Sequence, residues 1–551
     1  MEKGNKQSDF ENLPVCAADY IRLVIKKMRW RRKASADVQA ELIGHFEDAL
    51  KDCKTDEEKE KKAAELIADF GDAEMLAVLA RRAKKRCRPL WIKAIIKTFQ
   101  ATGIMICLSS LYVFWFLTGK PQITTDYIAV ANKLARPAVA DDSQNAAPLY
   151  EEAAKLIEFQ EKEVKFEAIR KDFSEANEID IAQIRQWLDR NSQALNLIAQ
   201  GTDMPYYWQT LRTNEPNNNS LWSALLPNLS EYRTLARGLK WRAYLSAEDG
   251  QYQKAFADLF VLYKFGKHQK GKKTIIENLV GMAIEHISMD TCRTILSRHK
   301  IPAEYPFSFS NNLQSVVAGE DFTMAPSFEF EKLFVYDEIQ RCYVEGPFGF
   351  DHLYMKGLSE VIVLFGNSDQ PPKTQEIFAK IWFSYSNKEQ TRNATDRYYD
   401  FWKMTSAETP YALKVRNLQA EVEQIIKGNL LLQILAPAME KIITLSWRNR
   451  ANAEATLAVI AIQRFKQEKE QLPDDLQEVV SAGYLTSLPM DPFSDKPLVY
   501  KKTENDFTLY SLGFDFDNDG GKMGDAKGGR PSIWNADDGD AVFWPVAESK
   551  K

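Results

Sequence analysis

The chain has 551 residues, of which 45% are hydrophobic and 27% charged, and its formal net charge is −5. This composition excludes a disordered chain, which would be less apolar, and a polytopic membrane protein, which would carry fewer charges. The charge is uneven, because residues 1–97 hold 22 Lys and Arg against 17 Asp and Glu, which leaves 50 and 60 for the remainder. A basic front and an acidic back are typical of a chain that faces two compartments.

Residues 19–90 show the apolar periodicity of short amphipathic helices, after a predicted flexible lead over residues 1–18. Three or four such helices pack into a small bundle. Gly71 is expected to end the third helix, and Asp72 to cap the fourth. The helices are predicted at 19–28, 37–52, 57–70 and from 72 to about 86.

These helices read YIRLVIKKM, ELIGHFEDAL and IADFGDAEMLA. Their order resembles the HAAS-type cytosolic domain, a small helical module found before membrane helices in bacterial signalling-associated proteins. The resemblance covers residues 19–83, and its sharpest motif runs from Phe70 to Glu74, with Ala73 where the family usually has Pro. It implies an interaction or signalling module and not an enzyme.

Residues 98–118 read TFQATGIMICLSSLYVFWFLT, with Gln100 as the only strongly polar side chain. About 20 consecutive apolar residues suffice to cross a bilayer as a helix, which satisfies its own backbone hydrogen bonds in lipid. We therefore predict a transmembrane helix over residues 94–118. It is too long for the apolar region of a signal peptide and lacks a small-residue cleavage site after it.

Most of the basic residues that flank this segment precede it. Within a comparable distance the far side offers only Lys120 and Lys133, and no acidic residue lies among the basic ones of the near side. The positive-inside rule therefore predicts a protein of the cytoplasmic (inner) membrane, with a cytoplasmic N-terminus and a periplasmic or exterior C-terminal part. An alternative role of the basic residues before the segment is contact with anionic lipid headgroups. The near-side residues are Arg81, Arg82, Lys84, Lys85, Arg86, Arg88, Lys93 and Lys97.

Residues 119–450 are predicted to form a large α-helical exterior domain. The segment LARGLKWRAYLSAEDGQYQKAFADLFVLYKFG, with Gly250 at its turn, resembles a single tetratricopeptide-type hairpin, although no repeat follows at that period. PAEYPFSFSNNL and GPFGFDHLYM are interpreted as loops, and Cys292 and Cys342 as a pair that an oxidising compartment would allow to bond. Helices are predicted near 126–135, 147–170, 179–199, 229–247, 252–266, 274–299, 329–341, 374–386 and 416–446.

Residues 451–545 differ in predicted secondary structure from the preceding domain. A helix is predicted over residues 453–470, followed by the strands PLVYK and DFTLYSL, which together indicate an α+β module. The ordered series LPDDL, DPF, KPL and LYSLG, with an aspartate-rich loop after it, resembles the C-terminal domain of the major pseudopilin of type II secretion. In that family the loop region binds calcium. A pseudopilin has its hydrophobic helix directly before this module, whereas residues 119–450 intervene here, so the resemblance implies a borrowed domain and not a fibre subunit.

The cation prediction also follows from the residues alone. Asp515, Asp517 and Asp519 alternate and are followed by Gly520, the pattern by which calcium loops converge carboxylates on one hard cation. Ala526 stands where an EF-hand needs its bidentate Glu, so a complete EF-hand is not expected. A solvated acidic turn is the alternative. The candidate calcium ligands are Asp515, Asp517, Asp519, Asp525, Asp537, Asp538 and Asp540.

Catalytic patterns are weak. The run from Gly266 to Lys273 approaches a phosphate-binding loop, but Lys273 replaces the Ser or Thr that holds magnesium and no strand precedes the run. Basic and aromatic residues do not interleave as in nucleic-acid-binding proteins. We therefore predict no enzyme, no catalytic residue and no nucleic-acid partner.

The sequence as a whole is typical of a bacterial single-pass envelope protein with a structural or interaction role, a calcium-stabilised C-terminal domain, the lipid bilayer as one partner and envelope proteins as others. One alternative is a transmembrane sensor whose cytosolic bundle engages a regulator. Another is an enzyme of undetected class within residues 120–450.

Overall fold

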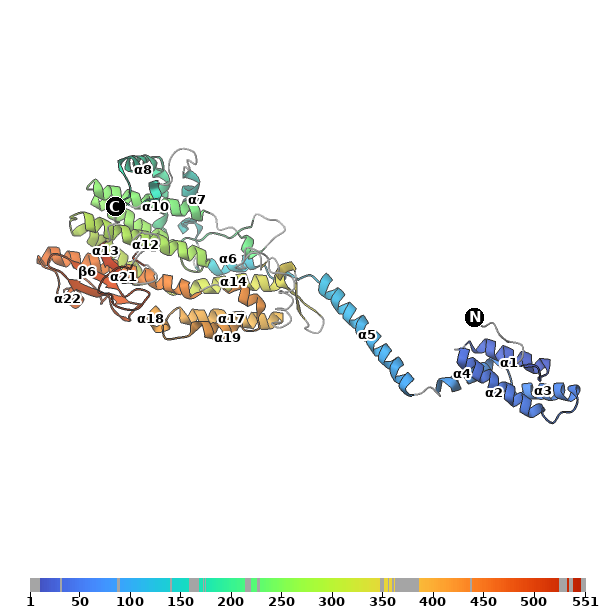
Figure 1. Cartoon of the computed structure of the whole chain (residues 1–551). Helices are drawn as coiled ribbons and strands as arrows, with labels where there is room; N and C mark the ends of the chain where they lie inside the picture. The colour runs from blue at the N-terminus through green and yellow to red at the C-terminus, as the bar shows by residue number, and fades with distance from the viewer. Residues whose placement is uncertain are drawn as a thin grey trace. The chain divides into compact units, whose positions relative to one another are not determined.

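The computed structural model shows a mostly helical chain with a few short strands, which confirms the predicted fold class at that level. The chain divides into two compact units, Met1–Thr118 and Gly119–Lys551 (Figure 1). The predicted boundaries within each unit stay predictions. The structure describes residues 10–29, 32–86, 90–138, 141–157, 168–171, 173, 175–213, 220–224, 228–346, 351–354, 356–358, 361, 386–436, 439–524, 533–534 and 539–546.

Four short helices with one shared core begin the first unit. Their inward side chains include Ile21, Val24 and Phe46, all of them fully buried. A capping box between Thr55 and Glu58 begins the third helix, as backbone N–H groups at a helix start need side-chain acceptors. The helices are α1 (Val15–Met28), α2 (Arg32–Leu50), α3 (Asp56–Phe70) and α4 (Ala73–Arg86).

The start of α4 follows the sequence prediction, whereas the start of α1 does not. Asp72 Oδ2 accepts hydrogen bonds from the backbone N–H groups of Glu74 and Met75, each at 3.1 Å. Helix α1 begins at Val15, within the range predicted as a flexible lead, because Ala17 and Ala18 are buried against the other helices.

Helix α5 (Leu90–Thr118) contains the predicted transmembrane segment. At 1.5 Å per residue a helix of 29 residues is about 43 Å long, which exceeds the ~30 Å hydrocarbon thickness of a bilayer. From Ala94 to Phe114 none of it is buried within the protein, and the stretch is long and apolar enough to cross a membrane.

The second unit is built mainly from helices. Its longer helices are α10 (Leu229–Glu248), α11 (Tyr252–His268), α12 (Ile275–Arg298), α13 (Glu304–Val317), α14 (Ala325–Cys342), α17 (Lys388–Thr405) and α21 (Met439–Lys469). The shorter ones are α6 (Tyr127–Ala135), α7 (Ala147–Leu156), α8 (Glu178–Arg190), α9 (Ser192–Thr202), α18 (Pro410–Leu413), α19 (Leu418–Ile426), α20 (Leu430–Leu435) and α22 (Leu476–Ser481). Single 3₁₀ turns occupy Asp142–Gln144, Ala168–Arg170 and Leu221–Ser223.

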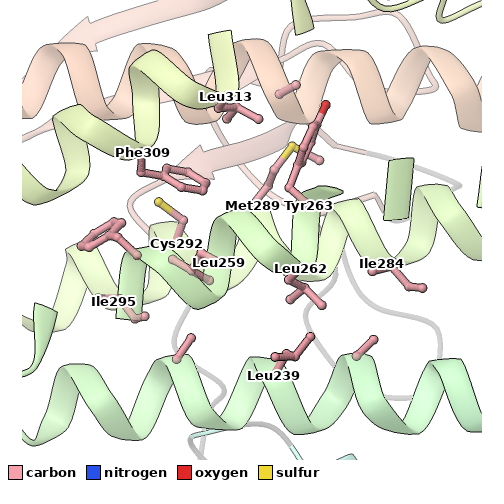
Figure 2. Close-up of a cluster of buried hydrophobic side chains, with 14 of the residues drawn as sticks. Leu239, Leu259, Leu262, Tyr263, Ile284, Met289, Cys292, Ile295, Phe309 and Leu313 are labelled. Atoms are coloured by element: carbon pink, nitrogen blue, oxygen red, sulfur yellow. The ribbon is translucent and has the colours of Figure 1, made fainter. Parts of the chain in front are cut away.

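Helices α10 and α11 form the predicted hairpin. Gly250 adopts a φ of 74° at the turn, in the left-handed region that glycine enters at little cost. Helix α12 packs against both helices, and α13 packs on α11. The core between them includes Leu239 of α10, Leu262 of α11, Met289 of α12 and Leu313 of α13 (Figure 2).

Two expectations for residues 300–470 were wrong in detail. The predicted loop at 302–313 lies mostly in α13, which tolerates Pro306 because the N–H groups of a first helical turn have no helical partner. The predicted helix over 416–446 is divided into α19, α20 and the start of α21, with Gly428 at a φ of 76° between the first two. The predicted helix 374–386 lies almost wholly outside the described residues.

A small antiparallel sheet follows α21. Strands β5 (Val499–Lys502), β6 (Phe507–Ser511) and β7 (Ala541–Trp544) pair in that order. The first two overlap the predicted strands PLVYK and DFTLYSL. Two-residue strands pair as β3 (Met490–Asp491) with β4 (Lys496–Pro497), and as β1 (Tyr343–Val344) with β2 (His352–Leu353).

The DPF motif has a structural explanation in this region. The buried carboxylate of Asp491 accepts hydrogen bonds from Phe493 N–H, Ser494 Oγ, Ser511 Oγ and Leu512 N–H, at 2.6–3.1 Å. One side chain therefore ties the β3–β4 turn to the end of β6. Loss of this acceptor would leave several buried donors without partners.

The hydrophobic core runs without a break from α10–α13 to the sheet. One cluster contains Leu259 of α11, Ile462 of α21, Leu509 of β6 and Phe543 of β7. Helix α21 itself crosses residue 450, where the sequence predicts a domain boundary. Cys292 lies in this cluster and Cys342 in a second one, and the structure forms no disulfide between them.

Candidate functional site

An acidic loop follows strand β6. Asp515, Asp517 and Asp519 each place a carboxylate oxygen such that the three oxygens lie within 4.8 Å of one another. Two oxygens that bind the same calcium ion at roughly 2.4 Å are at most about 4.8 Å apart, so this spacing is compatible with one shared cation. Without a cation, carboxylates this close repel one another.

Strand pairing brings a fourth carboxylate near this group. Ser511 of β6 is opposite Ala541 of β7, so Asp540, which directly precedes β7, returns to the acidic loop. Gly521 N–H donates to Asp540 Oδ2 at 2.6 Å, and Gly539 N–H donates to Asp515 Oδ2 at 2.6 Å. These two bonds hold the segments on either side of the site together.

Asp540 is the buried member of the group. Burial raises the pKa of its carboxyl above the ordinary range, and the charge of nearby Asp519 raises this pKa further. Asp540 Oδ1 has no hydrogen-bond partner among the described residues, although it is buried. A buried carboxylate oxygen without a donor fits a site that holds a cation.

Asn518 is a site residue that sequence reasoning missed. Its Oδ1 accepts hydrogen bonds from Tyr510 Oη at 2.9 Å and from Gly520 N–H at 3.0 Å. These bonds fix the loop between the alternating aspartates against β6. The tripeptide Asn518-Asp519-Gly520 is itself a turn signal and could have identified this role.

The predicted ligand set is therefore placed in part. Asp515, Asp517 and Asp519 form one cluster in the second unit, and Asp540 lies near Asp519 beside it. Asp525, Asp537 and Asp538 lie outside the described residues, as does Ala526.

The phosphate-loop-like run from Gly266 to Lys273 is the connection between α11 and α12. Gly266 lies within α11, and its backbone is close to that of Gly281 in α12. Lys273 is buried, with its Nζ 3.9 Å from the centroid of the Tyr207 ring and 2.5 Å from the carbonyl oxygen of His268. This run therefore packs two helices together, and Lys273 contacts Tyr207 and His268 within the protein.

His268, at the end of α11, is the half-buried histidine of this connection. Its Nδ1 lies 2.7 Å from Tyr150 Oη. Burial, together with Lys273, Lys264 and Lys267, lowers the pKa of His268 to about 3. The imidazole is therefore neutral at neutral pH.

No family model, curated protein or solved structure matches this chain. The resemblances to the HAAS-type domain and to the pseudopilin domain therefore stay predictions. The functional assignment depends on the geometry of the chain itself.

Proposed function

We propose that the chain is a single-pass membrane protein of the bacterial cell envelope. Helix α5 is its anchor, the second unit has a structural or interaction role towards other envelope proteins, and a calcium ion stabilises the loops around β6 and β7. The observation that carries the proposal is an apolar stretch from Ala94 to Phe114 of which no part is buried within the protein. In water such a surface is unfavourable, at roughly 25 cal/mol per Å² of apolar area, and lipid removes this cost.

The orientation proposed is the one that the charges favour. The basic residues between Arg81 and Lys97 precede α5, and only Lys120 and Lys133 lie soon after it. The first unit is then cytoplasmic and the second unit lies in the periplasm or outside the cell.

Extraction of membranes with alkaline carbonate tests the anchor. The full chain is expected to stay in the membrane pellet, because carbonate releases peripheral proteins and leaves spanning helices in place. The variant Leu108→Arg/Leu111→Arg is expected in the supernatant, since each central Arg costs a spanning helix about 3 kcal/mol. The matched variant Ala455→Ser/Thr456→Ser in α21 keeps the anchor intact and is expected in the pellet. Release of the unaltered chain would contradict the proposal.

The calcium proposal is supported by the three clustered carboxylates of Asp515, Asp517 and Asp519, and by the nearby buried Asp540, whose Oδ1 has no hydrogen-bond partner among the described residues. When bound, the ion would supply charge neutralisation that the loops lack. Asp515, Asp517, Asp519 and Asp540 would hold it, and Asn518 would orient the loop.

Calorimetric titration of the full chain in detergent tests this site. The whole chain is used because the core of residues 451–545 is shared with α10–α13. Heat of binding and a higher melting temperature are expected with calcium, and both are expected to vanish in Asp517→Asn/Asp519→Asn. The control Asp495→Asn changes an exposed aspartate of the β3–β4 turn at a φ of 54°, which Asn tolerates. Absence of both heat and a melting shift in the unaltered chain would contradict the proposal.

The calcium effect should also depend on pH. Because burial raises the pKa of Asp540 in the folded ion-free chain, a proton is taken up there more readily than in the unfolded chain. Lower pH thus stabilises the ion-free form through this group and makes protons compete with calcium. The melting shift produced by calcium is expected to shrink as the pH falls from neutral into the acidic range.

A further inference from the structure

Helix α4 presents a second unpartnered apolar surface, apart from the anchor. Met75, Val78 and Leu79 are 67%, 40% and 52% exposed. Their spacing of three and four residues puts them on one face of the helix, and the exposed side chains of Arg82 and Lys85 continue the same face toward its C-terminal end. We call these five residues the α4 stripe.

The rotation of α4 on the bundle is fixed, so the stripe cannot turn inward. Its opposite face is buried through Ala73 and Ala77. Arg81 Nε donates to the carbonyl oxygen of Met28 at 2.9 Å, at the end of α1. Two ion pairs add to this, Lys27 with Glu74 at 3.0 Å and Lys84 with Glu41 at 2.8 Å.

We propose that the α4 stripe docks on the anionic lipid surface of the bilayer that α5 crosses. The inference rests on the proposed function, because it needs the anchor. Only residues 87–89 separate α4 from α5, and three residues span at most about 11 Å. From Leu90 to Ala94 the helix rises about 6 Å more before the apolar stretch begins. The C-terminal end of α4 is therefore held close to the headgroups.

The charge of this region selects lipid of one kind. No acidic residue occurs between Met75 and Lys97, whereas eight basic ones do. Near a membrane surface, basic side chains are attracted to anionic headgroups, and apolar side chains on the same helix face enter the boundary between headgroups and acyl chains. The stripe offers both kinds of side chain on one face.

Quenching by lipids that carry a nitroxide on the acyl chain tests this contact. The full chain, with Cys16, Cys53, Cys87 and Cys107 replaced by Ser, is reconstituted into vesicles of phosphatidylcholine with or without phosphatidylglycerol. A fluorophore is attached at Val78→Cys, at Glu57→Cys on α3 as the matched control, or at Leu111→Cys in α5. Buried Cys292 and Cys342 are retained.

The label at 78 is expected to be quenched several-fold more than the label at 57 in anionic vesicles. That difference should fall in neutral vesicles, at high salt and in Met75→Ser/Leu79→Ser. If the labels at 78 and 57 are quenched equally little while the label at 111 is quenched, the docking inference is overturned and the anchor survives. Equal quenching at 78 in neutral and anionic vesicles would overturn the role of anionic lipid. If the label at 111 is also unquenched, the anchor proposal itself is wrong.

Discussion

Among the residues that the structure describes, two segments are long and apolar enough to cross a membrane, and they differ in how far the protein buries them. The stretch Ala94–Phe114 of α5 buries none of its length in the protein, whereas half of Leu430–Lys469, which contains α20 and α21, is buried. Composition and length do not separate the two segments. What separates them is whether other parts of the chain cover their side chains.

The polar side chains of α21 show why it belongs to a protein core. Arg293 of α12 is fully buried, and its Nη1 donates to Thr456 Oγ1 at 2.6 Å. Asn449 Nδ2 donates to Glu285 Oε2 at 2.5 Å. A helix that faces lipid has no such partners, so these pairs mark α21 as a helix that packs against α12.

The largest contrast is expected from one matched truncation. Ile462 of α21 is 0% exposed, and Ile106 of α5 is 62% exposed. Ile462→Ala should lower the free energy of unfolding of the second unit by about 2–5 kcal/mol, because it leaves a cavity in the core. Ile106→Ala should leave it unchanged. Urea unfolding of the full chain in detergent, followed by tryptophan fluorescence, measures both, and equal effects would break the comparison.

A smaller contrast is expected from removal of one hydroxyl. Thr456→Val leaves buried Arg293 without its closest acceptor and should destabilise the second unit by about 1–3 kcal/mol. The matched change in α5 is Thr98→Val, where an exposed hydroxyl bonds only the carbonyl of Ala94 at 3.0 Å. The same unfolding experiment should show no loss for Thr98→Val. A stable Thr456→Val chain would show that the α12–α21 contact is weaker than its geometry indicates.

The smallest expected effect, per pH unit, is a loss of stability of the second unit in acid. Burial lowers the pKa of His268 from 6.5 to about 3, so below pH 6.5 the unfolded chain binds a proton that the folded chain does not. The contribution of neutral His268 to the free energy of unfolding is present above pH 6.5. It is lost as the pH falls toward 3, at up to about 1.4 kcal/mol per pH unit. His268→Gln should reduce this dependence of the unfolding free energy on pH, which urea unfolding at several pH values measures. His286, whose pKa burial lowers to about 4, acts in the same direction with and without this substitution.

Local sequence signals predicted most of the helices, because apolar spacing and caps act within a few residues. Asp72, Gly250 and the α10–α11 hairpin are examples. The division of residues 416–446 and the helix over 304–317 were missed because tertiary packing decided them. Pro306 reads as a breaker until its place in a first helical turn is known.

The candidate site could also be predicted only where its residues are close together in the sequence. Alternation places Asp515, Asp517 and Asp519 together without knowledge of the fold. The position of Asp540 depends on the β6–β7 register, which joins residues far apart in sequence. The sequence therefore identified Asp540 as a candidate ligand but could not predict its position. The sequence also did not predict that the core continues through α21, because this continuity depends on contacts with α10–α13.

Protease protection in sealed vesicles tests the central claim, one crossing by α5, most directly. With the full chain inserted, protease on one face should cut only residues 1–86, and protease on the other face should cut only the unit Gly119–Lys551. A fragment that contains Ala94–Phe114 should resist both. Digestion of both units from the same face, or a protected fragment that contains α21, would contradict the account.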